Sequence, residues 1–258
     1  DLLLVKGFET GIAGAAVATV FAQGLSALIS FSILIHSLKK FETERTSHRC
    51  LFDIQMLGSM VKIAIPSMLQ QSIVSIGMLL VQSVVNGFGS SVLAGYTAGM
   101  RIESICVVPM IASGNAVSTF TAQNLGAGQG GRIKKGYLAA VRMVAAFAVI
   151  IFLALTLFHE NIMEAFLETG SEPAAFETGN GYLSFIAFFF VLIGLKAITD
   201  GVLRGAGDVV VFTMANLVNL SIRVSFAFVF APVLGVEAVW IAVPIGWAAN
   251  YLISFVRF

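Results

Sequence analysis

Charged side chains are scarce in this sequence. Asp, Glu, Lys and Arg make up 11% of its 258 residues, whereas soluble domains carry roughly 25%. Hydrophobic residues make up 58%, and the mean hydropathy is +0.93. This composition indicates a membrane protein, so we expect the lipid bilayer as a partner and no nucleic acid.

Cysteine and histidine are also rare. Cys50 is expected on a loop and Cys106 within a helix, which excludes a disulfide between them. His36, His48 and His159 are dispersed over a helix end and two loops, and no H-E-x-x-H motif or Ser-His-Asp set is present. The sequence therefore predicts no metal site and no cofactor, and it does not predict an enzyme.

Strands of alternating polar and apolar residues, the pattern of a membrane β-barrel, are missing. The sequence instead contains apolar runs of about 20 residues, the length that a helix needs to cross a bilayer. We predict an all-α, multi-pass integral membrane protein with about seven transmembrane helices. The runs are 11–38, 63–85, 104–125, 137–158, 181–203, 209–231 and 236–256.

Basic residues are unevenly distributed between the connections. If the first run crosses from outside to inside, almost all loop lysines and arginines fall on the inner side, as the positive-inside rule expects. We therefore predict a plasma-membrane protein with a cytoplasmic C-terminus. The inner set is Lys39, Lys40, Arg45, Arg49, Lys62, Arg132, Lys134, Lys135, Arg204 and Arg257.

A glycine-rich stretch, residues 123–135 (QNLGAGQGGRIKK), separates two apolar runs and fits G-x-G-x-x-G over Gly126–Gly131. A dinucleotide site would need a preceding strand and an acidic residue about 20 positions later. Here a membrane helix is predicted before the motif, and no acid occurs between Glu103 and Glu160. We expect no nucleotide, and we interpret the stretch as a cytoplasmic turn with basic residues at the lipid headgroups.

Several short motifs resemble the C-terminal lobe of MATE (multidrug and toxic compound extrusion) transporters, in matching places and order. The clearest is the loop with Gln123, Asn124, Gly126 and Gly128 before a basic helix start. The others are IAIP at 63–66, NGFG at 86–89, RIES at 101–104, RGAGD at 204–208 and PIGW at 244–247.

The resemblance implies a division of the chain. Residues 1–38 would hold the last helix of the N-terminal lobe, 39–60 a cytoplasmic linker, and 61–258 the C-terminal lobe. This lobe would form half of a twelve-helix, two-lobe transporter. The chain would then be a fragment that lacks most of the N-terminal lobe and does not transport alone. The linker is expected either as a solvated connector or as a short interfacial helix.

The implied function is secondary active multidrug efflux, in which an inward proton or sodium ion drives out a small organic, often cationic, compound by alternating access. A prokaryotic inner membrane is implied. Two alternatives stay open: a lipid-linked saccharide flippase of the same superfamily, which should have a more cationic cavity, and a non-transporting membrane scaffold. Convergence of polar residues from several helices would favour a transporter over the scaffold.

Polar side chains inside the apolar runs are the candidates for functional residues. A polar group buried in a membrane is costly unless it has a hydrogen-bond partner, contacts water or serves a function. Two interpretations remain for the uncharged ones: hydrogen bonds between helices, or the wall of a substrate cavity. This set is Gln70, Gln71, Gln82, Asn86, Asn216 and Asn219.

Four charged residues are candidates for ion coupling: Asp200, Glu103, Lys196 and Arg223. Lys196 and Asp200 are four apart and can form an ion pair on one helix face; alternatively, Asp200 titrates or binds a cation. Glu103 is expected at the outer end of a helix, either at the interface or as a site reached from outside. Arg101, two residues earlier, cannot face it. Where some branches of the family have an acid in the first helix of this lobe, Gln70 and Gln71 stand instead.

Overall fold

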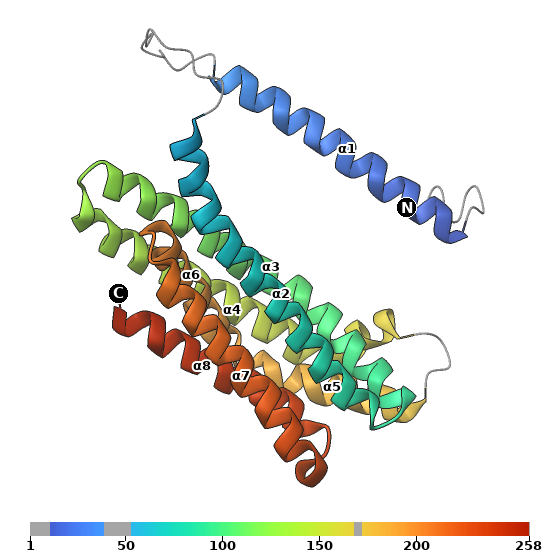
Figure 1. The fold of residues 1–258 in the computed structure, drawn as a ribbon. Coiled ribbons are helices and arrows are strands. Elements are labelled where there is room, and N and C mark those ends of the chain that lie inside the picture. The colour runs from blue at the N-terminus through green and yellow to red at the C-terminus, as the bar shows by residue number, and fades with distance from the viewer. Residues whose placement is uncertain (1–10, 39–52, 168–171, 258) are drawn as a thin grey trace, which may run out of the picture. The chain divides into compact units, whose positions relative to one another are not determined.

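The structure, a computed structural model, describes residues 11–38, 53–167 and 172–257. Helices make up nearly all of the described chain, and no strand occurs in it, so the all-α prediction is confirmed (Figure 1). The helices are α1 (Gly11–Leu38), α2 (Ile54–Asn86), α3 (Ser90–Gly126), α4 (Gly130–Phe166), α5 (Pro173–Ala187), α6 (Phe190–Gly205), α7 (Val209–Leu234) and α8 (Glu237–Arg257).

The chain divides into two compact units, Asp1–Ile54 and Gln55–Phe258. In the first unit the described element is α1, whose side chains are apolar almost all round and exposed, Val20 and Phe21 each at 72%. An apolar surface on all sides is typical of a membrane span. The second unit contains α2 to α8. Most of the predicted linker lies outside the described residues, but α2 already begins at Ile54.

Six of the described helices are long and apolar enough to cross a membrane, and α5 and α6 pass the same test only as a pair, with a bend of 59° between them. The predicted uninterrupted helix at 181–203 is therefore wrong. It breaks at Phe188 and Phe189, where the backbone N–H of Phe189 turns to the carbonyl of Ile186 at 2.9 Å. Neither residue at this break is a proline or a glycine. We attribute the bend to tertiary packing, since α5 and α6 pack on different parts of α3.

Helices α3 and α4 are longer than the predicted runs 104–125 and 137–158, with 37 residues each. Each is about 55 Å long, against about 30 Å of hydrocarbon. Most of the stretch between the runs 137–158 and 181–203 is helical as well, being the end of α4 and the start of α5. A search for uncharged runs misses the terminal helical turns of α3 and α4. They contain polar side chains, which are tolerated beyond the hydrocarbon layer or inside the protein.

The core of the second unit lies where α3 crosses α5 and α6. A Cβ added to Gly201 would lie 2.3 Å from the carbonyl oxygen of Gly114, and one added to Gly114 would lie 2.5 Å from that of Ala197. The α3 and α6 backbones are therefore in direct contact, as small residues allow between membrane helices. This contact fixes the position of Asp200, the residue before Gly201.

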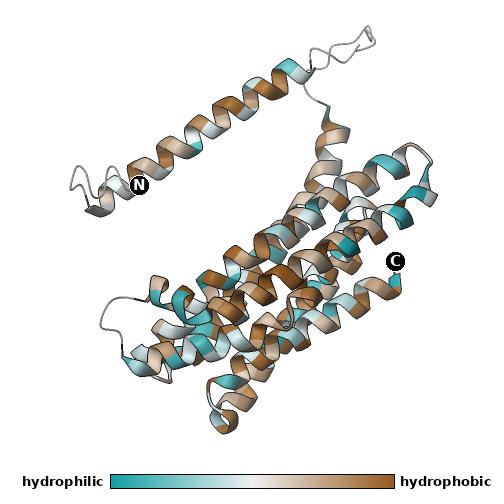
Figure 2. Cartoon of the chain, turned by 180° about the vertical axis from the view of Figure 1, so that it is seen from behind, coloured by the Kyte–Doolittle hydropathy of each residue, from teal (hydrophilic) through white to brown (hydrophobic). Residues whose placement is uncertain are grey.

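The connections of the second unit lie at its two ends, where hydrophilic residues gather in Figure 2. One end, here called the basic end, has the α3–α4 and α6–α7 connections and the end of α8. The described residues Arg132, Lys134, Lys135, Arg204 and Arg257 lie there. The opposite, acidic end has Glu160, Glu164, Glu172, Glu177 and Glu237. The charge asymmetry expected from the sequence is thus present in the fold, and the membrane orientation stays a prediction.

Candidate functional site

Asp200 is the centre of a polar cluster on α6, α7 and α8. The nitrogen Nζ of Lys196 lies 2.8 Å from Asp200 Oδ2, which confirms the predicted ion pair. Asn216 donates to the same oxygen at 3.4 Å and accepts from Lys196 at 3.1 Å. Ser254 donates to the other oxygen, Oδ1, at 3.0 Å. Asp200 is 4% exposed and has partners on both oxygens, so three helices hold a carboxylate inside the membrane unit.

A hollow of about 320 Å³ opens beside this cluster, and we call it the Asp200 hollow. Gln70 and Gln71 of α2 line one wall, and Thr213 donates to Gln70 Oε1 at 3.3 Å. Arg204 also lines the hollow; it donates to Asn115 Oδ1 at 2.9 Å and lies over the Phe212 ring, 5.5 Å from its centroid. The charged groups on its wall are thus two cations and one carboxylate.

The structure brings only part of the predicted cavity set together. Gln70, Gln71 and Asn216 line the Asp200 hollow. Gln82 is exposed further along α2, and Asn219 is buried where α7 meets α8. Asn86 ends α2 and lines a different hollow. The six amides therefore do not form one wall within the described residues.

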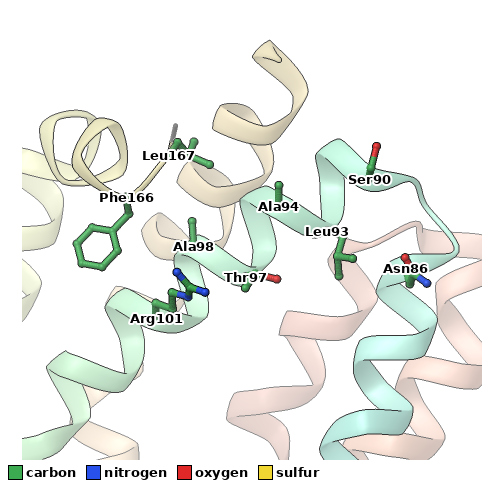
Figure 3. A pocket seen from close by; sticks show the side chains of 9 residues that line it. All are labelled: Asn86, Ser90, Leu93, Ala94, Thr97, Ala98, Arg101, Phe166 and Leu167. Carbon is green, nitrogen blue, oxygen red and sulfur yellow. The ribbon is translucent and has the colours of Figure 1, made fainter. Parts of the chain in front are cut away.

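The second hollow, of about 500 Å³, lies at the acidic end (Figure 3). Arg101 lines it together with Phe166 and Leu167, and it is the charged residue among those that line the hollow. The other lining residues are Asn86, Ser90, Leu93, Ala94, Thr97 and Ala98. Sequence reasoning did not place Arg101 in a site, because a single arginine without a motif gives no signal.

Glu103 lies well inside α3, which begins at Ser90, so its predicted place at the end of a helix is wrong. The Tyr182 hydroxyl donates to Glu103 Oε2, and no ion pair joins Glu103 to Arg101 in the described part of the chain. Tyr182 is fully buried, with Tyr96 and Trp240 against it at ring-centroid distances of 5.3 and 6.0 Å in edge geometry. The position of Glu103 inside α3 could not be predicted from the sequence, because the polar residues between Ser90 and Glu103 interrupt the apolar run.

Arg223 lies near Glu103 rather than in the Asp200 cluster. Its positive charge acts on Glu103, Tyr96 and Tyr182. No carboxylate among the described residues lies within salt-bridge distance of it. The two carboxylates proposed from the sequence therefore have different cationic neighbours, Lys196 for Asp200 and Arg223 for Glu103.

The glycine-rich stretch forms a tight turn at the basic end. Gly128 has φ 69°, the N–H of Gln129 donates to Asn124 O at 2.8 Å, and that of Gly128 donates to Leu125 O at 3.0 Å. These are the two bonds of a Schellman cap. Asn124 is buried and donates to Phe120 O at 2.7 Å, whereas Gln123 is exposed. Since α3 precedes the motif and Gly130 already begins α4, the turn interpretation is confirmed.

The sequence was compared with the profiles of known families and with curated proteins. The profile of the MatE family matches residues 66–229. The chain is 29% identical to the probable multidrug resistance protein YpnP of Bacillus subtilis over 99% of this chain and 56% of that protein. It is 25% identical to a protein named FAD transporter from Shewanella oneidensis, over 98% and 57%. The chain thus spans about half the length of the curated relatives it matches.

Solved structures agree on the fold. A MOP superfamily transporter from Pyrococcus furiosus, described as having a binding pocket of reversed polarity, superposes with a TM-score of 0.86 at 20% identity. The alignment covers 99% of this chain and 57% of that one. A multidrug resistance MATE transporter in its outward-facing conformation gives a TM-score of 0.84 at 22% identity, over 99% and 57%.

Proposed function

The chain belongs to the MatE family, and on this premise we propose that it is one lobe, with an adjoining helix, of a secondary active transporter that exports small organic molecules. The multi-pass fold and the Asp200 cluster, in which residues of three helices meet, support this proposal. Charge buried at membrane depth is costly unless it is paired or has a task. Transport would proceed by alternating access, with the Asp200 hollow as part of the substrate path.

The single observation that carries the proposal is the hydrogen-bonded Asp200 cluster beside an open hollow. Protonation of Asp200, or binding of a cation to it, would remove the negative charge that holds Lys196. The ammonium group would then be free to act on a substrate in the hollow or on Asn216. Ion and substrate binding would thus be coupled through one carboxylate. Binding of the ion at Asp200 would change the affinity of the hollow for the substrate, and binding of the substrate would change the affinity for the ion.

Glu103 is proposed as a second coupling group. It is partly buried, Tyr182 donates a hydrogen bond to it with Tyr96 and Trp240 packed against that ring, and Arg223 provides a counter-charge. In the substrate path, Gln70, Gln71 and Asn216 would offer amide donors and acceptors. We propose that the basic end faces the cytoplasm, in keeping with the positive-inside rule.

The relatives' names do not favour the flippase or scaffold alternatives, but the hollow does raise a second substrate class. Lys196 and Arg204 line the hollow on the same helix as Asp200, so its wall has two cations for one carboxylate and does not favour a permanent cation. An anionic or zwitterionic compound would suit it better. Export of a flavin dinucleotide is therefore a second candidate, since one relative is named FAD transporter. In this proposal the nucleotide is cargo, bound in the hollow and not at the glycine-rich turn.

The test is efflux from vesicles that contain the full-length protein, first under a proton gradient and then under a sodium gradient. Ethidium represents organic cations and FAD represents the anionic class. We expect efflux of at least one compound that follows one of the gradients, with a loss of about tenfold or more in Asp200→Asn. Asp208→Asn, a carboxylate substitution at the basic end outside the hollow, is the matched control and should retain activity. No efflux of either compound under either gradient would refute the proposal.

A further inference from the structure

One side of α4 has two basic residues in an otherwise apolar surface. Lys135 and Arg142 are seven positions apart, so they lie within about 20° of each other around the helix. Both are exposed. No ion pair joins either of them to an acid in the described part of the chain. The sequence itself has no acid between Glu103 and Glu160, so these two positive charges have no acidic neighbour along the chain either.

Small and apolar residues continue the same side of the helix. Ala139 lies between the two basic residues, and Ala146 and Val149 follow Arg142 at helical spacing. All three are exposed. We call this side, with Lys135, Ala139, Arg142, Ala146 and Val149, the α4 outer face.

The α4 outer face points away from the rest of the lobe. The buried residues of α4 lie on the opposite side of the helix, where α4 packs on α3, α5 and α6. They include Ile133, Tyr137, Ala140, Val144 and Ala148. The Asp200 hollow is lined by residues of α2, α3, α6 and α7, and none of its described lining residues belongs to α4. In the proposed two-lobe arrangement, a second lobe that borders this hollow therefore leaves the α4 outer face to the lipid.

Arg142 lies inside the membrane-spanning part of α4. The apolar run 137–158 is about 33 Å long, close to the hydrocarbon thickness of about 30 Å. If the run begins at the membrane boundary, the Arg142 backbone lies about 8 Å inside the hydrocarbon layer. A charge at that depth is costly unless it reaches a polar partner.

The direction of α4 favours such a partner at the basic end. Side chains on a helix tilt toward its N-terminus, and α4 begins at the basic end with Gly130. A long arginine side chain with this tilt extends along the helix toward Lys135 and the lipid headgroups. The group that it meets first on a lipid-facing surface is the phosphate of a neighbouring lipid.

The chemistry of the α4 outer face selects among lipids. An arginine can bind a phosphate through two parallel N–H donors, and a lysine adds a point charge. Lys135 and Arg142 lie about 11 Å apart along the helix axis, and the small Ala139 leaves room for a headgroup between them. A zwitterionic headgroup brings its own cation, which the two basic residues repel. An acidic headgroup brings negative charge alone and therefore fits this face better.

We infer that the α4 outer face binds an acidic phospholipid of the leaflet at the basic end. The headgroup phosphate contacts Arg142 and Lys135, and an acyl chain follows Ala146 and Val149 toward the acidic end. The lipid-facing position of this site rests on the proposed function, but binding itself does not require transport. If Arg142 only reached water at the membrane surface, acidic and zwitterionic lipids would bind this face equally.

The first test measures which lipids the full-length protein retains in native mass spectrometry. The protein in detergent is incubated with equal amounts of phosphatidylglycerol and phosphatidylcholine. We expect the wild-type protein to retain phosphatidylglycerol in preference by about threefold or more. Arg142→Gln and Lys135→Gln should each reduce this preference by about twofold or more, because each removes one phosphate contact.

Two variants separate a local site from an effect of net charge. Arg257→Gln removes the same charge from an exposed position at the same end, but on α8, and should keep the preference. Arg142→Lys keeps the charge and loses the paired donors, so it should retain at least half of the preference.

The second test changes no charge. Ala139→Phe places a ring between the two basic residues and should reduce the preference about as much as Arg142→Gln does. Ala146→Phe is the matched control: it makes the same change on the same face, on the far side of Arg142 from Lys135. A ring there lies beside acyl chains and should leave the preference intact.

Three results would overturn the inference: equal retention of both lipids by the wild-type protein, an unchanged preference in Arg142→Gln, or the same loss in Arg257→Gln. If Arg142→Gln does not fold, the comparison of Ala139→Phe with Ala146→Phe decides, and equal preferences in these two variants refute the site. Neither test depends on transport. Lipid selectivity without efflux would refute the proposed function only, and efflux without lipid selectivity would refute this inference only.

Discussion

Asp200 and Glu103 are both carboxylates held inside the same membrane unit, yet their surroundings differ. Asp200 has polar partners from three helices, an ammonium group at 2.8 Å and an open hollow beside it. Glu103 has one tyrosine hydroxyl, aromatic rings and a more distant guanidinium group. The first setting compensates charge by contact, and the second compensates it mainly by a single hydrogen bond.

This difference shows which of the two carboxylates needs a charged neighbour to be stable in its buried position. Removing the cation beside Asp200 would leave a buried negative charge with neutral donors only. Glu103 can become neutral and still accept from Tyr182, since a protonated carboxyl keeps a free acceptor oxygen. We therefore expect the Asp200 region to respond strongly to changes of charge and the Glu103 region to respond more to loss of the tyrosine.

The largest effect is expected from Lys196→Met. It leaves Asp200 without its cation, and breaking a buried ion pair in this way costs about 3–5 kcal/mol. The double variant Lys196→Met with Asp200→Asn removes both charges and should recover most of the loss. Glu103→Gln, in contrast, should cost clearly less than Lys196→Met. Thermal unfolding in nanodiscs measures all of these; equal losses in the single and double variants would contradict the ion-pair argument.

A somewhat smaller effect is expected where α3 crosses α6. In Gly201→Ala the new methyl group would lie 2.3 Å from the backbone oxygen of Gly114, which cannot move aside. We expect a loss of about 3 kcal/mol, at the upper end for overpacked sites. Gly99→Ala would meet the Tyr182 ring at 2.7 Å and should cost less, because a ring can shift.

The control for both glycine variants is Gly181→Ala. Gly181 lies within α5 with nothing inside 4 Å of an added Cβ, so alanine there should be neutral or slightly stabilising. Gly201→Ala should disturb the Asp200 region and Gly99→Ala the Glu103 region. An unfolding temperature of Gly201→Ala equal to that of Gly181→Ala would show that the helix crossing is looser than described.

Tyr182→Phe tests the Glu103 side directly. It removes the hydroxyl that donates to the carboxylate while keeping the ring between Tyr96 and Trp240. A hydrogen bond to a charged group contributes about 1.5–3 kcal/mol, and a neutral one about 0.5–1.5 kcal/mol. Thr213→Val removes a neutral bond to Gln70, 3.3 Å long, and should therefore cost less. If the two variants lose the same stability, Glu103 is not charged in the resting protein.

The smallest effect is expected at the basic end, outside both regions. Arg257 donates to Asp208 at 2.8 Å, and this hydrogen bond lowers the pKa of the Asp208 carboxyl below its usual value. A lowered pKa in the folded state adds stability above the unfolded pKa of about 3.9, and that stability is lost as pH falls through the folded value. Arg257→Gln should therefore lower the unfolding temperature slightly at pH 7, and the difference should shrink as the pH falls below about 3.9. High salt should reduce the difference, since Arg257 is largely exposed.

Part of the site could be predicted from local spacing. The four-residue separation of Lys196 and Asp200 fixes their pairing on any helix, and the glycines of residues 126–131 fix a sharp turn. Both predictions hold because the partners lie within a few residues of each other. The two-residue separation of Arg101 and Glu103 likewise excludes their pairing, whatever the rest of the chain does.

Other parts of the site depend on residues far apart in the sequence. Ser254 lies fifty-four positions from Asp200 and Tyr182 seventy-nine from Glu103, and no local pattern connects them. The bend between α5 and α6 contains no proline or glycine from which it could be predicted. The ends of α3 and α4 could not be predicted either, because polar residues interrupt the apolar runs there. Each of these features results from packing against another helix.

The sequence by itself determined the class of this protein: scarce charge and apolar runs of about 20 residues require membrane helices, because a bilayer admits only helices or closed barrels and the alternation of barrel strands is missing. It also determined the charge asymmetry of the two ends and the turns. Only the tertiary structure decided which polar side chains meet. Burial makes an unpartnered polar atom costly, so the final surroundings of Asp200 and Glu103 depend on how all the helices of the second unit pack at once.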